Sequence, residues 1–317
     1  MTPARPAPPA AVRLVAGSFT FLLFATNTVV LCLVLYAATL LKFVVPLAGW
    51  RRLVSRLLVA IGNAWIGVNT FCLRITQPTV YDVEGLEGLR RDASYLVISN
   101  HQSWVDIPVL QGVFLRRLAF LRFFLKQELI RVPMLGIAWW ALDFPFMKRH
   151  SREAVEKNPA LRLEDLEATR RACERFRHAP AAILNFVEGT RFTPAKHERS
   201  GAEYRHLLPP KAGGLAFAAS VMGPQLKGIV DVTIVYPHGR PTFWDLISLG
   251  LPRVVVRVRE LPIPGDWFAS DYTENAEFRE GVQAWMRRLW DAKDETISGL
   301  LLPRDASAGP SGRSRAG

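Results

Sequence analysis

Residues 95–106 read YLVISNHQSWVD, an apolar run followed by a polar turn that holds a histidine and an aspartate. A short apolar run bounded by turn residues predicts a buried strand. Asn100 marks the end of that strand, because asparagine favours turns and caps. In an open α/β sheet, ligands bind at the carboxyl ends of the strands. We therefore expect His101 to act as a general base at the end of a central strand.

The spacing of His101 and Asp106 restricts how the two side chains can meet. Five positions at about 100° each leave them on different faces of one helix. Contact therefore requires His101 in the turn and Asp106 at the start of the next helix, and Asn100 and Pro108 suit that geometry. The alternative is a capping box between Ser103 and Asp106. The two interpretations are compatible, because one carboxylate can both cap a helix and orient an imidazole.

A second apolar strand, expected at residues 181–187, also ends in a polar turn, Glu188-Gly189-Thr190-Arg191. Gly189 lets the backbone approach a ligand closely, and the guanidinium of Arg191 matches phosphate geometry. Glu188 could orient that guanidinium or bind a hydroxyl. This turn is structural in the alternative interpretation. Because it follows a second buried strand, we expect it to form the wall opposite His101.

Lys126 follows another apolar run, residues 118–125, and is a candidate phosphate contact. A solvated surface lysine is an equally good interpretation of this residue. The three cysteines, at positions 32, 72 and 173, are far apart and lack metal-ligand spacing, so neither a disulfide nor a metal site is expected.

Strands that alternate with helices predict an α/β domain whose central sheet is mainly parallel and flanked by helices. An N-terminal membrane-embedded helical segment is expected to precede this domain. Strands are expected at residues 80–85, 94–99, 144–147, 181–187, 228–236 and 254–258, and helices at 105–114, 151–177, 209–221 and 277–297. The predicted organisation is a disordered N-terminus (1–13), a membrane-associated segment (14–75), a catalytic domain (76–302) and a disordered tail (303–317).

Residues 14–41 contain no charged side chain, and this run of 28 exceeds the ~20 residues that span a bilayer core. A signal peptide has a shorter apolar region, so we predict membrane insertion. Positive charge is heavier after this run than before it, which places the catalytic body in the cytoplasm. A second stretch, residues 53–75, is more polar and predicts an interfacial helix. A core helix of the soluble domain is its alternative.

The chain of 317 residues carries 40 Lys and Arg against 28 Asp and Glu, a formal net charge of +12. This balance indicates an anionic partner, which could be nucleic acid, an anionic membrane or an acidic substrate. A nucleic-acid partner does not explain the apolar run at 14–41, so we expect an anionic membrane and no nucleic acid.

Four ordered motifs resemble those of the glycerophospholipid acyltransferase family. They are Asn100-His101-x4-Asp106, Lys126-x-Glu128-Leu129 with Pro133 and Gly136, Glu188-Gly189-Thr190-Arg191, and Val232-Thr233-Ile234-Val235-Tyr236-Pro237. The chain is most similar to a bacterial inner-membrane branch of 1-acyl-glycerol-3-phosphate acyltransferase-like proteins, which is related to animal lysocardiolipin acyltransferases. Residues 123–149 and 185–197 support that branch, and the resemblance covers about residues 14–300.

The resemblance implies that His101 is the base and Asp106 its partner, and that Lys126 and Arg191 hold substrate phosphate. The acyl donor would be a thioester of coenzyme A or of acyl carrier protein, the acceptor a lysophospholipid such as 1-acyl-glycerol-3-phosphate, with no further cofactor. The implied location is the bacterial inner membrane. The charged segment at 151–177 departs from short family members and leaves the substrate open.

Three alternatives remain open at this point. Remodelling of lysophosphatidylglycerol or lysocardiolipin would use the same chemistry, and a non-catalytic lipid-binding scaffold would use none of it. A serine hydrolase is disfavoured because the chain has no G-x-S-x-G elbow. A zinc hydrolase is disfavoured because no second ligand lies at helical spacing from His101.

Overall fold

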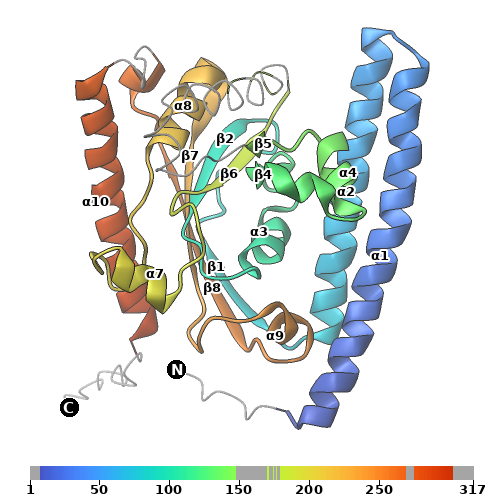
Figure 1. The fold of residues 1–317 in the computed structure, drawn as a ribbon, viewed down its shortest axis with the longest axis horizontal. Helices are drawn as coiled ribbons and strands as arrows, with labels where there is room; N and C mark the ends of the chain where they lie inside the picture. The colour runs from blue at the N-terminus through green and yellow to red at the C-terminus, as the bar shows by residue number, and fades with distance from the viewer. Residues whose placement is uncertain are drawn as a thin grey trace, which may run out of the picture.

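A computed structural model describes residues 8–147, 170, 174, 176, 179–268 and 275–302. Two long N-terminal helices, α1 (Ala10–Val44) and α2 (Ala48–Thr76), stand side by side and precede an α/β domain (Figure 1). The helix expected at 151–177 and the tail expected at 303–317 fall mainly or wholly outside the described residues.

The central sheet has the strand order β1-β8-β7-β2-β6-β3. All neighbouring strands in it are parallel except β7 and β8. The prediction of a mainly parallel sheet flanked by helices is therefore confirmed. The strands are β1 (Val80–Glu84), β2 (Ser94–Ser99), β3 (Leu121–Phe123), β6 (Ala182–Phe186), β7 (Leu226–Val235) and β8 (Arg253–Leu261). A separate two-stranded sheet pairs β4 (Leu125–Lys126) with β5 (Phe146–Met147).

β2 lies at the middle of the sheet and is buried on both faces. Tyr95 and Val97 contribute to one hydrophobic core, and Leu96 and Ile98 to the other. This alternation follows from the two-residue period of a strand. The first core lies beneath α3 (Asp106–Phe114) and the N-terminal helices, and the second lies beneath α8 (Gly213–Met222) and α10 (Ala276–Leu301).

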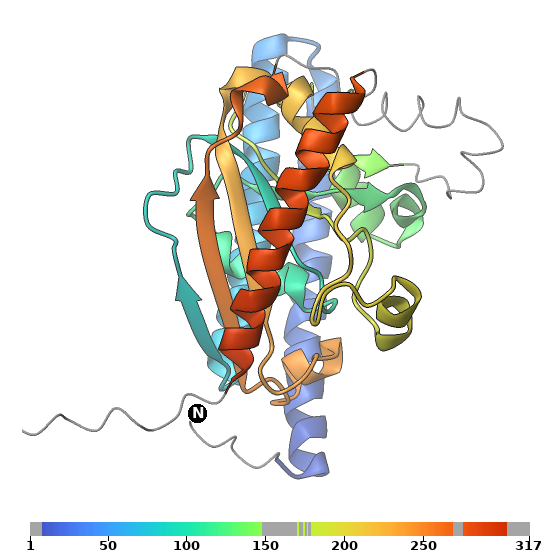
Figure 2. The same cartoon turned by 90° about the vertical axis from the view of Figure 1, so that its left-hand side faces the viewer.

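The two faces of the sheet are covered by different helices. Figure 2 shows α10 crossing one face, with α1 and α2 behind the other. The other helices in the described residues are α4 (Leu135–Ala141), α7 (Pro194–Arg199), α9 (Phe243–Ile247) and 3₁₀ turns at Gln127–Arg131, Gly223–Gln225 and Gly265–Phe268. The carboxyl end of β2 is thus enclosed between helical layers.

Several element boundaries differ from those expected. The helix expected from residue 209 begins at Gly213. The amide of Lys211 donates to the carbonyl of Val187 at 2.8 Å, so the residues before Gly213 are held against the end of β6. The apolar run 118–125 forms two short strands, β3 and β4, rather than one, and the strand expected at 144–147 shortens to β5.

α1 and α2 form an antiparallel hairpin joined by polar contacts. The Nδ2 of Asn27 donates to the Oδ1 of Asn69 at 2.8 Å, and the Nε1 of Trp65 donates to the Oγ1 of Thr28 at 3.1 Å. By length and composition, both helices are apolar enough to cross a membrane. Residues 53–75, expected as an interfacial or a core helix, lie within α2. One face of α2 packs against the domain core through buried side chains such as Val54 and Leu58. These features indicate membrane association.

Candidate active site

The turn after β2 is held to the neighbouring strand by Asn100. Its Nδ2 donates to the carbonyl of Ile234, and its Oδ1 accepts from the amide of Ile234, both at 2.9 Å. The buried side chain thus extends the pairing of β2 and β7 by one step. His101 is thereby positioned at the carboxyl end of the central strand.

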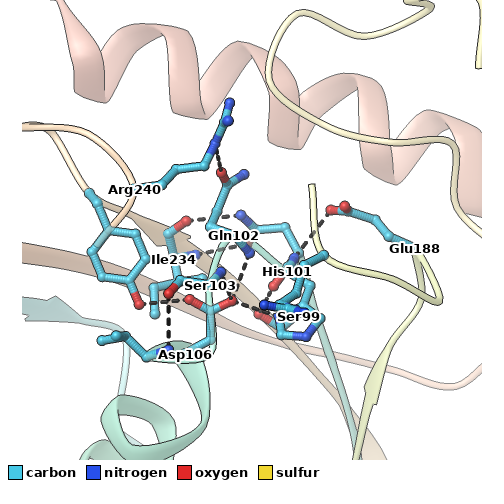
Figure 3. A network of polar contacts seen from close by, with 12 residues as sticks. Ser99, His101, Gln102, Ser103, Asp106, Glu188, Ile234 and Arg240 are labelled. Atoms are coloured by element: carbon cyan, nitrogen blue, oxygen red, sulfur yellow. Dashed lines mark hydrogen bonds and ion pairs between the residues drawn. The ribbon is translucent and has the colours of Figure 1, made fainter. Parts of the chain in front are cut away.

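The expected contact between His101 and Asp106 is present (Figure 3). The Nδ1 of His101 lies 2.8 Å from the Oδ2 of Asp106, which is fully buried at the first residue of α3. The same oxygen accepts from the amides of Gln102 at 2.7 Å and Ser103 at 3.0 Å. Because the carboxylate accepts the proton on Nδ1, Nε2 is left as the basic nitrogen.

The helix-capping interpretation holds in part. The carboxylate of Asp106 accepts from the Ser103 amide, as a capping box requires. The Oγ of Ser103, however, donates to the carbonyl of Pro241 at 2.5 Å and accepts from the amide of Val105 at 3.1 Å. Asp106 therefore both closes the turn and orients the imidazole.

The His101 turn and the 188–191 turn are adjacent, as expected for two walls of one site. The imidazole stacks on the ring of Phe186, the last residue of β6, with ring centroids 3.9 Å apart. The carbonyl of His101 accepts from the amide of Phe192 at 2.8 Å. The His101 side chain is 12% exposed, so it remains open to a substrate.

Glu188 does not orient Arg191, which was one of its two expected roles. It is buried, and its Oε1 accepts from the amide of His101 at 3.3 Å. Its Oε2 is buried without a hydrogen bond. Burial raises the pKa of Glu188 well above its usual range, although the amides of His101 and Leu208 oppose that shift. The carboxyl group therefore braces the backbone of the His101 turn.

The rest of this turn presents cations to the site. Gly189 has a φ of +73°, which favours glycine. The Nζ of Lys196 donates to the Oγ1 of Thr190 at 2.6 Å and to the carbonyl of Arg191 at 3.1 Å. The Arg191 guanidinium lies 4.3 Å from the centroid of the Trp104 ring. Within the described chain it has no carboxylate partner, so it can receive an anion.

Lys126 lies apart from these contacts. It is exposed on β4, in the separate two-stranded sheet. Among the described residues, no hydrogen bond or ion pair joins Lys126 to His101 or Arg191. The structure thus brings together His101, Asp106 and residues 188–191, and it does not bring Lys126 into that network.

Tyr236 and Arg240 lie at the same turn, although neither was among the predicted site residues. The hydroxyl of Tyr236 donates to the Oδ1 of Asp106 at 2.7 Å. Burial and the neighbouring carboxylate raise the pKa of Tyr236 well above its usual range, so the donor proton is retained. The Nε of Arg240 donates to the Oε1 of Gln102 at 3.1 Å (Figure 3). Tyr236 follows β7 and belongs to the fourth motif, which was a usable signal, whereas nothing in the sequence singled out Arg240.

Comparison with known proteins identifies the family. A model of the acyltransferase family matches residues 80–237, which contain His101, Asp106 and the 188–191 turn. The chain belongs to the acyltransferase family. No group of three or more His, Cys, Asp or Glu side chains in the described residues is arranged to hold a metal ion.

Relatives of this acyltransferase-family chain include enzymes from plants and animals. It is 28% identical over 242 residues to 1-acyl-sn-glycerol-3-phosphate acyltransferase 3 of Arabidopsis thaliana, covering 71% of this chain and 58% of that protein. It is 27% identical over 254 residues to 1-acyl-sn-glycerol-3-phosphate acyltransferase delta of Homo sapiens, covering 76% and 60%. The chain thus spans about three fifths of the length of these relatives.

The crystal structure of the 1-acyl-sn-glycerophosphate acyltransferase PlsC from Thermotoga maritima has the same fold. Its TM-score with this chain is 0.51 at 20% sequence identity, and the match covers 87% of this chain and 97% of that one. The shared region includes most of the chain, and the resemblance at this identity is one of fold.

Proposed function

We propose that this protein is a membrane-bound O-acyltransferase. It moves a fatty acyl chain from a thioester, acyl-CoA or acyl carrier protein, to the free hydroxyl of a lysophospholipid such as 1-acyl-glycerol-3-phosphate. The observation that carries the proposal is the His101–Asp106 pair at the end of β2, with Nδ1 bonded at 2.8 Å and Nε2 open. The match to the acyltransferase family over residues 80–237 supports the reaction class.

In the proposed mechanism, Nε2 of His101 takes the proton of the acceptor hydroxyl, and the hydroxyl oxygen attacks the thioester carbonyl carbon. The new C–O bond forms, the C–S bond breaks, and the leaving sulfur takes the proton from the imidazolium. Asp106 stabilises that imidazolium, as an aspartate does in a hydrolytic triad. The acceptor hydroxyl takes the place of a serine, so no acyl-enzyme forms.

Arg191 is the proposed phosphate ligand. Its guanidinium is held over Trp104 and has no carboxylate partner within the described chain. Lys196 adds positive charge at the same turn through its contact with Thr190. Lys126 remains a second proposed phosphate ligand, and its exposed position on β4 leaves it free to approach a bound lipid. The catalytic domain is proposed to lie on the cytoplasmic side of a bacterial inner membrane.

An acyl-transfer assay on the purified, membrane-reconstituted chain tests this function. It should cross lysophosphatidic acid, lysophosphatidylglycerol and lysocardiolipin with acyl-CoA and acyl carrier protein thioesters. Because base catalysis supplies roughly 10²–10⁴-fold, His101→Ala should lower turnover by about that factor. His238→Ala, which removes an exposed histidine, is the matched control and should retain activity. A folded, fully active His101→Ala enzyme would refute the assignment, and transfer only to the other lysolipids would indicate remodelling.

A further inference from the structure

A groove of about 530 Å³ lies between the C-terminal part of α2, β1 and α3. We call it the arginine groove, because Arg74, Arg116 and Arg117 line it. None of the candidate active-site residues lines it. Figure 1 shows α3 lying between the sheet and α2, which places this groove on the side of the domain that carries the helical hairpin.

The walls of the arginine groove are apolar. Leu73 of α2, Val83 of β1 and Val113 of α3 face it from three different elements. α3 approaches α2 closely here, since a Cβ atom at Gly112 would lie 3.1 Å from the Oγ1 of Thr70. The groove therefore presents apolar surface enclosed by two helices and an edge strand, which suits a hydrocarbon chain.

The charge of the groove is uncompensated. Within the described part of the chain, the side chains of Arg74, Arg116 and Arg117 form no ion pair. The carboxylates of the adjoining strand are already engaged, because Asp82 is bound by Arg253 and Arg257, and Glu84 by Arg257. An anion entering the groove would therefore meet three exposed guanidinium groups without competition.

The backbone holds two of these arginines at the groove by an unusual turn. Arg116 is the second residue after α3 and has a φ of +65°, a left-handed conformation that is uncommon for a residue other than glycine. The turn is closed by the amide of Arg117, which donates to the carbonyl of Phe114 at 2.9 Å. The end of α3 thus sets the backbone positions from which both arginines line the groove.

The groove adjoins the apolar outer face of α2. Phe71 and Ile75, in the same helical turns as Arg74, are 60% and 61% exposed. A ligand that combines a hydrocarbon chain with a phosphate would satisfy both the walls and the charge. We propose that the arginine groove binds one anionic phospholipid taken from the membrane, with an acyl chain against Leu73, Val83 and Val113 and its phosphate on the three arginines. This inference rests on the proposed membrane association and not on acyl transfer.

Native mass spectrometry of the full chain in detergent tests the proposal, with phosphatidylglycerol, phosphatidic acid and phosphatidylcholine as added lipids. One tightly held anionic lipid is expected, with phosphatidylcholine retained more weakly. Loss of three cationic contacts in R74Q/R116Q/R117Q should weaken binding of the anionic lipids by about 100-fold. Equal retention of all three lipids by the wild-type chain would overturn the proposal.

Two controls separate a seated lipid from general attraction. R51Q/R52Q/R56Q removes the same charge from three exposed positions at the other end of α2 and should bind as wild type. Val113→Trp fills the groove without changing its charge and should lose the lipid. Equal loss in both triple variants, or wild-type binding by Val113→Trp, would refute the groove. His101→Ala should still bind the lipid, so failure of acyl transfer and failure of this site are distinguishable.

Discussion

Asp106 is the residue on which the candidate site depends. Its two oxygens accept from Nδ1 of His101, from two turn amides and from the hydroxyl of Tyr236. A buried carboxylate that accepts from this many donors holds its neighbours in place. The imidazole is thus fixed in one tautomer before any substrate arrives.

The buried Glu188 should make the stability of the fold depend on pH. Because burial raises its pKa well above the usual range, the folded chain keeps a proton that the unfolded chain releases above about pH 4.3. Its contribution to stability is therefore full below that pH and is lost as the pH rises toward the folded pKa. Between pH 5 and 8, the melting temperature of the wild type should fall relative to that of Glu188→Gln.

The control for this experiment is Glu198→Gln, which changes an exposed glutamate on α7. Its melting temperature should follow the wild type at each pH. If the melting temperatures of the wild type and Glu188→Gln differ by a constant amount from pH 5 to 8, the proton held by Glu188 does not contribute to stability.

Arg191 should contribute to binding the phosphate of the acceptor lipid. Losing a charge-assisted contact costs about 1.5–3 kcal/mol, so Arg191→Ala should raise the KM for a phosphate-bearing acceptor by roughly 10- to 100-fold. Arg191→Lys keeps the charge and loses the planar guanidinium, so its KM should lie between those of the wild type and Arg191→Ala. Steady-state kinetics with lysophosphatidic acid measure this, with Arg199→Ala on α7 as the control. An unchanged KM in Arg191→Ala would remove the phosphate role.

At the scale of elements, α10 is fastened to β7 by a buried lysine. The Nζ of Lys293 donates to the carbonyl of Val232 at 2.7 Å and to the Oγ1 of Thr233 at 3.1 Å, and it lies 2.6 Å from the Oδ1 of Asp231. Arg259 pairs with the other oxygen of Asp231 at 2.6 Å. These contacts place a charge pair in the layer between helix and sheet.

Removing one partner of a buried pair should destabilise the chain by about 3–5 kcal/mol. We expect Lys293→Met to show this loss in urea unfolding, because the carboxylate of Asp231 keeps only the half-exposed Arg259. The double variant K293M/D231N should recover much of the loss, since it buries no unpaired charge. Arg288→Met, which removes a cation from an exposed position on α10, should change little. Equal stability of the single and double variants would contradict the coupling.

At the scale of the whole molecule, the hairpin lies beside the α/β domain rather than beyond it (Figures 1 and 2). α2 contributes buried residues from Val54 to Leu73, and the hydroxyl of Tyr36 in α1 donates to the carbonyl of Met134. The opposite faces of both helices expose large apolar side chains. A bilayer can cover those faces while the turn between the helices stays on the same side of the membrane as the α/β domain.

We therefore predict that the hairpin lies along one side of the membrane, with the turn between its helices accessible from the side of the α/β domain. Cysteines introduced at Gly49, near the hairpin turn, and at Glu295, on α10, should react with an impermeant maleimide from the same side of the membrane. Both cysteines should be introduced into a variant in which the native cysteines have been replaced. Labelling in intact spheroplasts and in inverted vesicles provides the comparison. Reaction of the two positions from opposite sides would establish a spanning hairpin instead.

Local patterns in the sequence were sufficient for the central strand, the His101 turn, the 188–191 turn and the apolar helices. Each depends on residues within a few positions of one another, where strand period, turn preference and apolar length act directly. The start of α8 was not among them, because the helix expected from residue 209 begins at Gly213. The family resemblance rested on these same local motifs.

Only the tertiary structure determined which distant groups meet. Tyr236 is 130 residues from Asp106, and Asn100 is 134 residues from its partner Ile234. The order of strands in the sheet brings these pairs together, and hydrophobic period carries no information about that order. The burial of Lys293 has the same origin, and so do the three groove arginines that have no ion pair among the described residues, because the free energy of a charge depends on which neighbours the fold supplies.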